Sequence, residues 1–205
     1  MSNSITVSTG SNKMKSKDYI TIGIFTVLFF VITMVCIFAS AATVVTFIFG
    51  PSIAAVFAGI IYMLMRIKVP KKGSIFLSGA VIGIVEFLIG AGWPVAVSFI
   101  IGAVLAELVS VSGNYRSFTK NAIGYAVYMT CFAIGTFLPM VLIPSYTDSM
   151  SNSNGVDDAY MENLHKLLNG PMVLVIAVVA FIASIIGAFI AKALLNKHFK
   201  KAGII

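Results

Sequence analysis

Hydrophobic residues fall into six long runs along the chain, and short stretches richer in polar residues, glycine or proline separate them. A helix that crosses the hydrocarbon core of a bilayer needs about 20 apolar residues. Periodicity within the runs adds little, because a helix that faces lipid is apolar all round. The pattern predicts an all-α integral membrane protein, with one membrane domain at 19–200 after a tail at 1–18. Its six transmembrane helices are expected at residues 20–39, 52–65, 74–89, 94–111, 120–142 and 171–195.

The stretch 39–49 between the first two runs is uncharged and is followed by Gly50-Pro51. Because proline favours the first turn of a helix, one expectation is that the second helix starts at Ser52. The preceding stretch would then dip back into the membrane as a re-entrant cap. A single long helix kinked at Pro51 fits the same pattern equally well.

The one long polar stretch, residues 143–169, carries four acidic residues and Lys166. Loops of this length are usually either functional lids or disordered segments. Within it, 157–168 places Tyr160, Leu164 and Leu168 near one face, which predicts a short amphipathic helix. Such a helix could cover a pocket that opens to the outside.

Composition agrees with a membrane protein, since 59% of the residues are hydrophobic and 10% are charged. The formal charge of +7 does not indicate nucleic-acid binding, because the basic residues are scattered at the ends of the hydrophobic runs. If six helices cross the membrane, all of the 14 Lys and Arg residues except Lys166 lie on one side. Basic residues near span ends are retained in the cytoplasm, so both termini are expected there.

Signatures of enzymes and metal sites are missing from the sequence. It has no HExxH, GxSxG or P-loop pattern, and Cys36 and Cys131 have no metal-ligand spacing. We therefore expect no catalysis, no cofactor and no metal. If the protein moves a solute with ATP, another subunit must bind the nucleotide.

Glu86 and Glu107 are the two carboxylates inside the predicted spans. A charge at mid-bilayer costs about 2.5–3.5 kcal/mol on insertion scales, so both should face the protein interior. Glu86 lies about 20 Å along a helix that runs outward from Gly73, which makes it a candidate substrate contact. Glu107 lies near the cytoplasm and is a candidate coupling residue, or an ion-pair partner of Arg66 or Arg116. A purely structural carboxylate is the alternative for both.

Asn121, Tyr125, Tyr128 and Phe132 recur at helical spacing and predict one face of the fifth helix. That face could line a cavity or could simply belong to the packed core. We expect a substrate pocket among the outer halves of the helices, roofed by 39–49 and 143–169. Its candidate contacts are Glu86, Trp93, Thr46, Phe49, Tyr146 and Tyr128.

Four motifs within residues 17–200 carry a resemblance to a known family: Lys17-Asp18-Tyr19, the turn at 90–94, the run at 102–108 and the run at 120–125. The chain resembles the substrate-binding S component of an energy-coupling factor (ECF) transporter, specifically the family labelled Trep_Strep. The resemblance implies a six-helix bundle in the bacterial cytoplasmic membrane. It also implies partnership with a transmembrane coupling protein (the T component) and two ATP-binding-cassette ATPases, and uptake of a vitamin-like micronutrient by toppling.

The sequence departs from this family at the expected contact with the coupling protein. Many S components present Ala-x-x-x-Ala on the first helix, whereas the corresponding small-spaced positions here are Gly23 and Val27. Together with Glu107, these are the candidate contacts with the coupling module. Two alternatives from other classes stay open: a stand-alone secondary carrier, and an intramembrane enzyme that uses Glu86 or Glu107 as acid or base.

Overall fold

The computed structural model describes residues 13–143, 146 and 157–201. This part of the chain is helical, with no strand in it. Its helices are α1 (Ser16–Ser40), α2 (Val44–Ile48), α3 (Gly50–Lys68), α4 (Ser74–Leu88), α5 (Trp93–Val111), α6 (Phe118–Leu142), α8 (Asp158–Leu167) and α9 (Gly170–Lys201).

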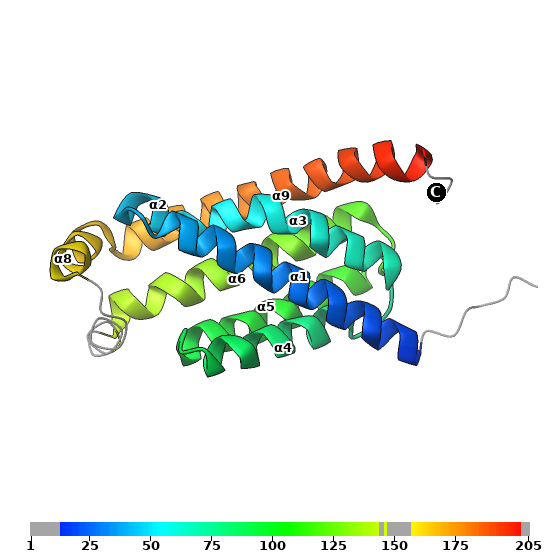
Figure 1. Ribbon diagram of the computed structural model, residues 1–205, viewed down its shortest axis with the longest axis horizontal. Helices are drawn as coiled ribbons and strands as arrows, with labels where there is room; N and C mark the ends of the chain where they lie inside the picture. The colour runs from blue at the N-terminus through cyan, green and yellow to red at the C-terminus, as the bar shows by residue number, and fades with distance from the viewer. Residues whose placement is uncertain (1–12, 144–145, 147–156, 202–205) are drawn as a thin grey trace, which may run out of the picture.

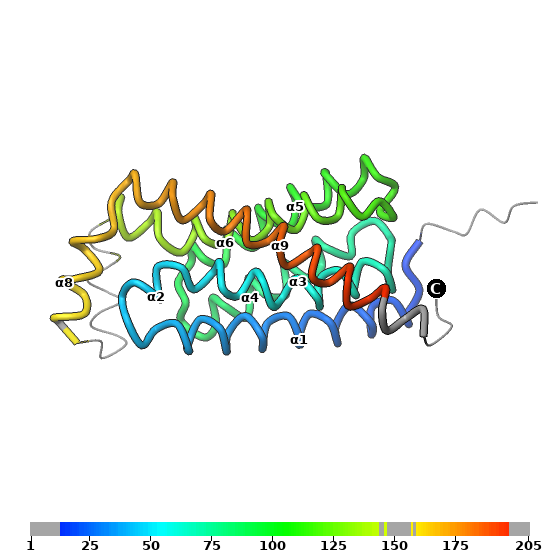
Figure 2. The backbone as a smooth tube through the Cα atoms, turned by 90° about the horizontal axis from the view of Figure 1, so that it is seen from above, coloured from blue at the N-terminus to red at the C-terminus, as the bar shows by residue number. Residues whose placement is uncertain are grey.

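The six longer helices form a closed ring, in the order α1, α3, α9, α6, α5 and α4, with α4 returning to α1. Contacts between α3 and α6 cross the inside of the ring. Figure 1 shows these helices side by side, and Figure 2 shows α1 on the side opposite α5 and α6. The start of α1 and the end of α9 lie at the same end of the bundle, here named the terminal end.

Five of the described helices are long and apolar enough to cross a membrane: α1, α3, α5, α6 and α9. The helix α4 is also apolar but has 15 residues, which at 1.5 Å per residue span about 22 Å. The outward face of α1 exposes a continuous apolar surface that includes Ile20, Ile24, Val31 and Val35. These features define an integral membrane helical bundle.

Small residues allow the helices to approach closely, as they often do in membrane proteins. A Cβ atom at Gly59 of α3 would lie 2.9 Å from the carbonyl carbon of Gly187 in α9. A Cβ atom at Gly187 would lie 2.5 Å from the carbonyl oxygen of Ala55. Ala180 and Ser184 are also fully buried along α9. The stripe of small residues in the last hydrophobic run is therefore a packing surface.

The connection between the first two runs contains a separate short helix. Helix α1 continues to Ser40, and α2 ends at Ile48, so Phe49 alone separates it from α3. The prediction of one continuous kinked helix is therefore wrong, whereas re-entry of 39–49 into the membrane stays a prediction. Helix α3 starts at Gly50, with Pro51 in its first turn, and extends to Lys68. Arg66 consequently lies in the last turn of α3 and not in the following connection.

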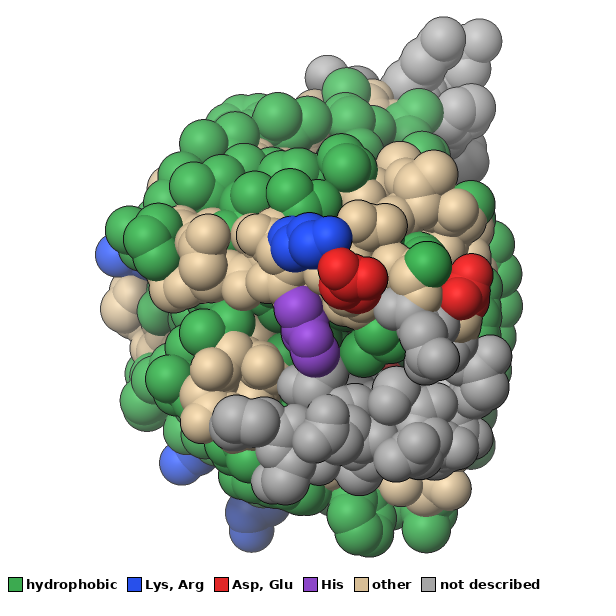
Figure 3. All heavy atoms as spheres, turned by 90° about the vertical axis from the view of Figure 1, so that its left-hand side faces the viewer, with side chains coloured by type: hydrophobic (Ala, Val, Ile, Leu, Met, Phe, Trp, Pro, Cys, Tyr) green, Lys and Arg blue, Asp and Glu red, His purple; other side chains and the backbone are tan. Residues whose placement is uncertain are grey.

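The helices α2 and α8 meet at the end opposite the terminal end, here named the capped end. The rings of Phe47 and Tyr160 lie 6.4 Å apart, and Ile48 shares a buried cluster with Leu164 and Leu168. The amphipathic helix predicted at 157–168 is confirmed, with the Asp157 side chain accepting from the N–H of Ala159 at 3.1 Å. Figure 3 looks onto this end, where a few charged side chains lie among hydrophobic ones.

Candidate functional site

The inward face of α4 carries the buried polar side chains of Ser78 and Glu86. Ser78, Ile82 and Glu86 follow one another at intervals of four residues, so they share this face, and all three are buried. The hydroxyl of Thr26 in α1 donates to the hydroxyl of Ser78 at 2.8 Å. Glu86 lies eight residues further, about 12 Å towards the capped end.

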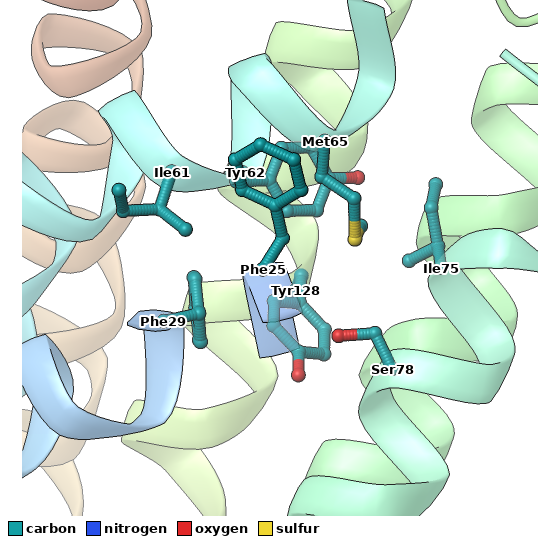
Figure 4. Close-up of a pocket in the computed structure, with 8 residues that line it drawn as sticks. All are labelled: Phe25, Phe29, Ile61, Tyr62, Met65, Ile75, Ser78 and Tyr128. Atoms are coloured by element: carbon teal, nitrogen blue, oxygen red, sulfur yellow. The ribbon is translucent and has the colours of Figure 1, made fainter. Parts of the chain in front are cut away.

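A cluster of aromatic rings faces this part of α4. The ring of Tyr128 in α6 lies 5.8 Å from Phe29, 6.2 Å from Tyr62 and 5.6 Å from Phe99. Figure 4 shows Tyr128 below Tyr62 and beside Ser78, with its hydroxyl group pointing away from Tyr62. The cavity between these residues has a volume of about 10 Å³. That volume is close to the minimum for a single water molecule, so the interior is closed around Tyr128.

Three buried polar groups of this interior have no hydrogen-bond partner among the described residues: Oε1 of Glu86 and the hydroxyls of Tyr62 and Tyr128. Glu86 is 2% exposed. Burial of a polar group without a partner is costly, and burial of a carboxylate is more so. A bound molecule that donates a hydrogen bond to Oε1 of Glu86 would remove this cost of burial and would therefore be stabilised there.

Tyr146, in the long polar stretch, contacts the turn between α4 and α5. Its hydroxyl donates to the carbonyl of Ala91 at 3.2 Å, and a Cβ atom at Gly92 would collide with the same hydroxyl. Gly92 also has a φ of 91°, which favours glycine. Burial raises the pKa of Tyr146, so this hydroxyl stays protonated and can donate at neutral pH.

The other residues predicted for the outer pocket divide between the capped end and the surface. Phe49 is half-buried and packs in the same cluster as Tyr146. Thr46 is exposed, and its hydroxyl donates to the carbonyl of Ser40 at 2.6 Å, which joins α1 to α2. Trp93, at the start of α5, is 55% exposed. The structure thus places Glu86 and Tyr128 in the interior and Phe49 with Tyr146 under the cap, but Trp93 and Thr46 outside both groups.

Glu107 has a clear structural partner in the N-terminus of α4. Its Oε1 accepts from the N–H of Gly73 at 2.6 Å. Its Oε2 accepts from the N–H groups of Ile75 and Phe76 at 3.1 and 3.3 Å. The first N–H groups of a helix have no partner inside the helix, so this carboxylate caps α4 from the neighbouring helix. The expected alternative ion pair with Arg66 or Arg116 does not form in the described part of the chain.

The two candidate contacts on α1, Gly23 and Val27, both lie on its outward face. Val27 is 61% exposed. A Cβ atom at Gly23 would have no described atom of another helix within 4 Å, in contrast to Gly59 and Gly187. Glycine destabilises a helix interior by about 1 kcal/mol relative to alanine. No close packing within the described part of the chain offsets that cost at Gly23.

Several buried residues, among them Phe29 and Tyr62 beside Tyr128, were not singled out by any sequence pattern. Phe29 and Tyr62 come from the first two hydrophobic runs, whose residues are apolar on every side, so no periodicity distinguishes them. Arg66 was treated as a loop residue because it is the first of four basic residues that follow the second run. Its position four residues after Tyr62 was the available signal that it shares the buried face.

This arrangement defines a class: an all-helical integral membrane protein with a closed polar interior and a helical cap at one end. The chain belongs to the family of hypothetical bacterial integral membrane proteins named Trep_Strep, whose model matches residues 16–201. No curated protein and no solved structure matches the chain.

Proposed function

We propose that this protein is the substrate-capture subunit, or S component, of an ATP-driven ECF-type importer. In this role it binds a vitamin-like or other micronutrient at the capped end and delivers it by toppling on a coupling module. The capped end faces the outside, and both termini lie in the cytoplasm of the bacterium. The chain itself does not catalyse a reaction, because partner ATPases hydrolyse the ATP.

The observation that carries this proposal is the buried carboxylate of Glu86 in the last turn of α4, at the end of that helix nearer the capped end. Glu86 Oε1 has no hydrogen-bond partner among the described residues. Ionisable groups inside a membrane bundle are costly and usually serve function. The cap is built from two segments far apart in sequence, α2 and α8, and Tyr146 attaches to the turn that follows Glu86. Tyr146 thus links the cluster that α2 and α8 form to the end of α4 that carries Glu86.

The closed interior fits a protein that encloses its ligand. A cavity of about 10 Å³ next to Tyr128 is too small for a micronutrient, so binding there requires the aromatic side chains around it to separate. Phe29, Tyr62 and Tyr128 come from α1, α3 and α6, and only side-chain packing joins their rings. Flat aromatic surfaces suit a ring-containing ligand, while Glu86 suits a cationic or hydrogen-donating group.

The outward face of α1 supports docking of a partner protein. Gly23 is the point on this face where another helix could approach most closely, since no described atom of the chain covers it. We assign this face to the transmembrane coupling protein, which works with two ATP-binding-cassette ATPases. Glu107, at the terminal end of the bundle, would support this contact by holding the start of α4 in place.

Mass spectrometry of small molecules retained after gentle purification tests ligand capture. The wild-type protein is expected to carry a micronutrient that Glu86→Gln binds more weakly, by about 1.5–3 kcal/mol for a lost charge-assisted hydrogen bond. Glu162→Gln is the matched control, because Glu162 is an exposed residue of α8 paired with Lys166. Equal retention by all three proteins would contradict a role for Glu86. Uptake of the identified molecule by the chain alone, without ATP, would instead favour a secondary carrier.

A further inference from the structure

A second hollow lies at the terminal end of the bundle, far from the capped end. It is formed between α3, α6 and α9 and has a volume of about 490 Å³. This volume is large enough for a small molecule or a lipid headgroup. Its polar lining consists of Arg66, Tyr115, Arg116, Asn121, Lys192 and Asn196.

The hollow is strongly basic. Arg66, Arg116 and Lys192 line it, and no Asp or Glu is among its described lining residues. The two ion pairs in the described part of the chain, Lys71–Asp18 and Lys166–Glu162, lie elsewhere. Glu107 is the carboxylate whose charge acts on Arg66, but its oxygens accept from three backbone N–H groups. Three positive charges therefore meet here without a carboxylate bound to them.

Arg66 is held rigidly at the base of this hollow. It is 1% exposed, and its guanidinium carbon lies 5.3 Å from the centre of the Tyr115 ring. Its Nε donates to Oδ1 of Asn121 and its Nη1 donates to the carbonyl of Val69, both at 3.2 Å. Nη1 also donates to the hydroxyl of Ser74. Nη2 has no partner among the described residues, so one edge of a buried, oriented guanidinium is left available.

Asn121 fixes the position of Arg66 and is itself fixed. Its Nδ2 donates to the carbonyl of Tyr115 at 3.0 Å, which leaves Oδ1 oriented towards Arg66. On the other wall, the ammonium group of Lys192 lies 4.6 Å from the centre of the Phe118 ring. The basic groups thus come from α3, α9 and the connection before α6, and they surround the hollow.

We propose that this hollow binds a phosphate group. A guanidinium with a free N–H edge matches the oxygens of a phosphate, and two further basic side chains supply the remaining charge. Met63, Ile67 and Leu195 line the same hollow and provide apolar contacts beside the charged groups. The phosphate would belong either to an anionic lipid headgroup or to a soluble phosphate ester. This site is separate from the interior around Glu86, so the inference does not rest on the proposed function.

Native mass spectrometry of the full-length protein in detergent tests this site. The probes are dioleoyl phosphatidylglycerol, dioleoyl phosphatidylcholine and glycerol 3-phosphate. The test variant is Arg116→Gln/Lys192→Gln, because both residues are exposed and their replacement leaves the buried Arg66 network intact. The matched control is Lys72→Gln/Lys120→Gln, which removes two charges from the same end of the bundle without altering the lining of the hollow.

The wild-type protein should bind the phosphatidylglycerol more tightly than the phosphatidylcholine, or should bind glycerol 3-phosphate. The test variant should lose roughly twentyfold to thirtyfold in affinity, since each basic residue near an anionic surface contributes about fivefold. The control should retain nearly wild-type affinity. Displacement of the bound lipid by glycerol 3-phosphate would identify a soluble phosphate ester as a competing ligand, whereas tight lipid binding without displacement would identify the headgroup. Equal losses in the two variants, or wild-type protein that binds neither anionic probe more tightly than zwitterionic phosphatidylcholine, would overturn the proposal.

Discussion

Replacement of Glu107 by alanine removes the carboxylate that caps α4 and leaves the first N–H groups of that helix without it. Three N–H groups lose an acceptor, those of Gly73, Ile75 and Phe76. The bond from Ile75 is fully buried, whereas the other two are partly buried and can regain water as a partner. The full free-energy cost of an unsatisfied buried N–H is therefore expected for Ile75 but not for Gly73 or Phe76.

The magnitude follows from these contacts. An unsatisfied buried N–H costs about 1–3 kcal/mol, and loss of a negative charge at a helix N-terminus costs about 0.3–1 kcal/mol. Glu107→Ala should therefore destabilise the protein by about 1.3–4 kcal/mol. For a chain of this length, each kcal/mol lowers the melting temperature by about 2–4 °C, so a decrease of roughly 3–16 °C is expected. Glu107→Gln keeps one acceptor oxygen and should fall between the alanine variant and the wild type.

Thermal unfolding in detergent, followed by the fluorescence of the single tryptophan, measures this effect. Glu162→Ala is the control, because it removes a carboxylate from an exposed pair with Lys166 that contributes about 0.3–0.5 kcal/mol. If Glu107→Ala melts within the range of this control, the carboxylate does not hold the start of α4. In that case its assignment as a capping residue is refuted.

Two further predictions concern the partner surface and the orientation in the membrane. Gly23→Leu should reduce association with the coupling protein in co-purification, whereas Gly170→Leu should not. A Cβ atom at either glycine meets no described atom within 4 Å, but only Gly23 lies on the proposed docking face. Equal association of both variants would argue against that face. In intact cells that express the protein without its native cysteines, an impermeant thiol reagent should label the variant Asn163→Cys on α8 but not Lys72→Cys. Both positions are exposed, and they lie at opposite ends of the bundle. Labelling of position 72 from outside would contradict the proposed orientation.

The sequence was most informative where polar and apolar residues alternate on one element. The polar stretch around α8 has a hydrophobic face of Leu164 and Leu168, and both leucines are buried as that face predicts. The inward face of α6, with Tyr125 and Tyr128, was predicted because its residues recur at steps of four and three along the chain, and both tyrosines are buried. The burial of Glu86 followed from the cost of a charge in lipid.

Features that depend on contacts between distant segments could not be predicted. The partner of Glu107 is a set of backbone N–H groups on another helix, and backbone groups leave no mark on the residue sequence. Arg66 was expected in the connection after the second run, but it lies in the last turn of α3, where Asn121 and Tyr115 from a later helix and connection contact its side chain. Trp93 is exposed at the start of α5, as an aromatic residue at a membrane interface would be, and its contact with a substrate stays a prediction.

Co-purification tests the central proposal most directly, because it does not require knowledge of the substrate. The tagged chain is expressed with the coupling protein and the two ATP-binding-cassette ATPases of its own host, extracted in mild detergent and analysed for stoichiometric subunits. A substrate-capture subunit should be recovered in a complex that contains the coupling protein and both ATPases. Recovery of the folded chain alone, under conditions in which the coupling protein and the ATPases remain bound to one another, would contradict the proposal.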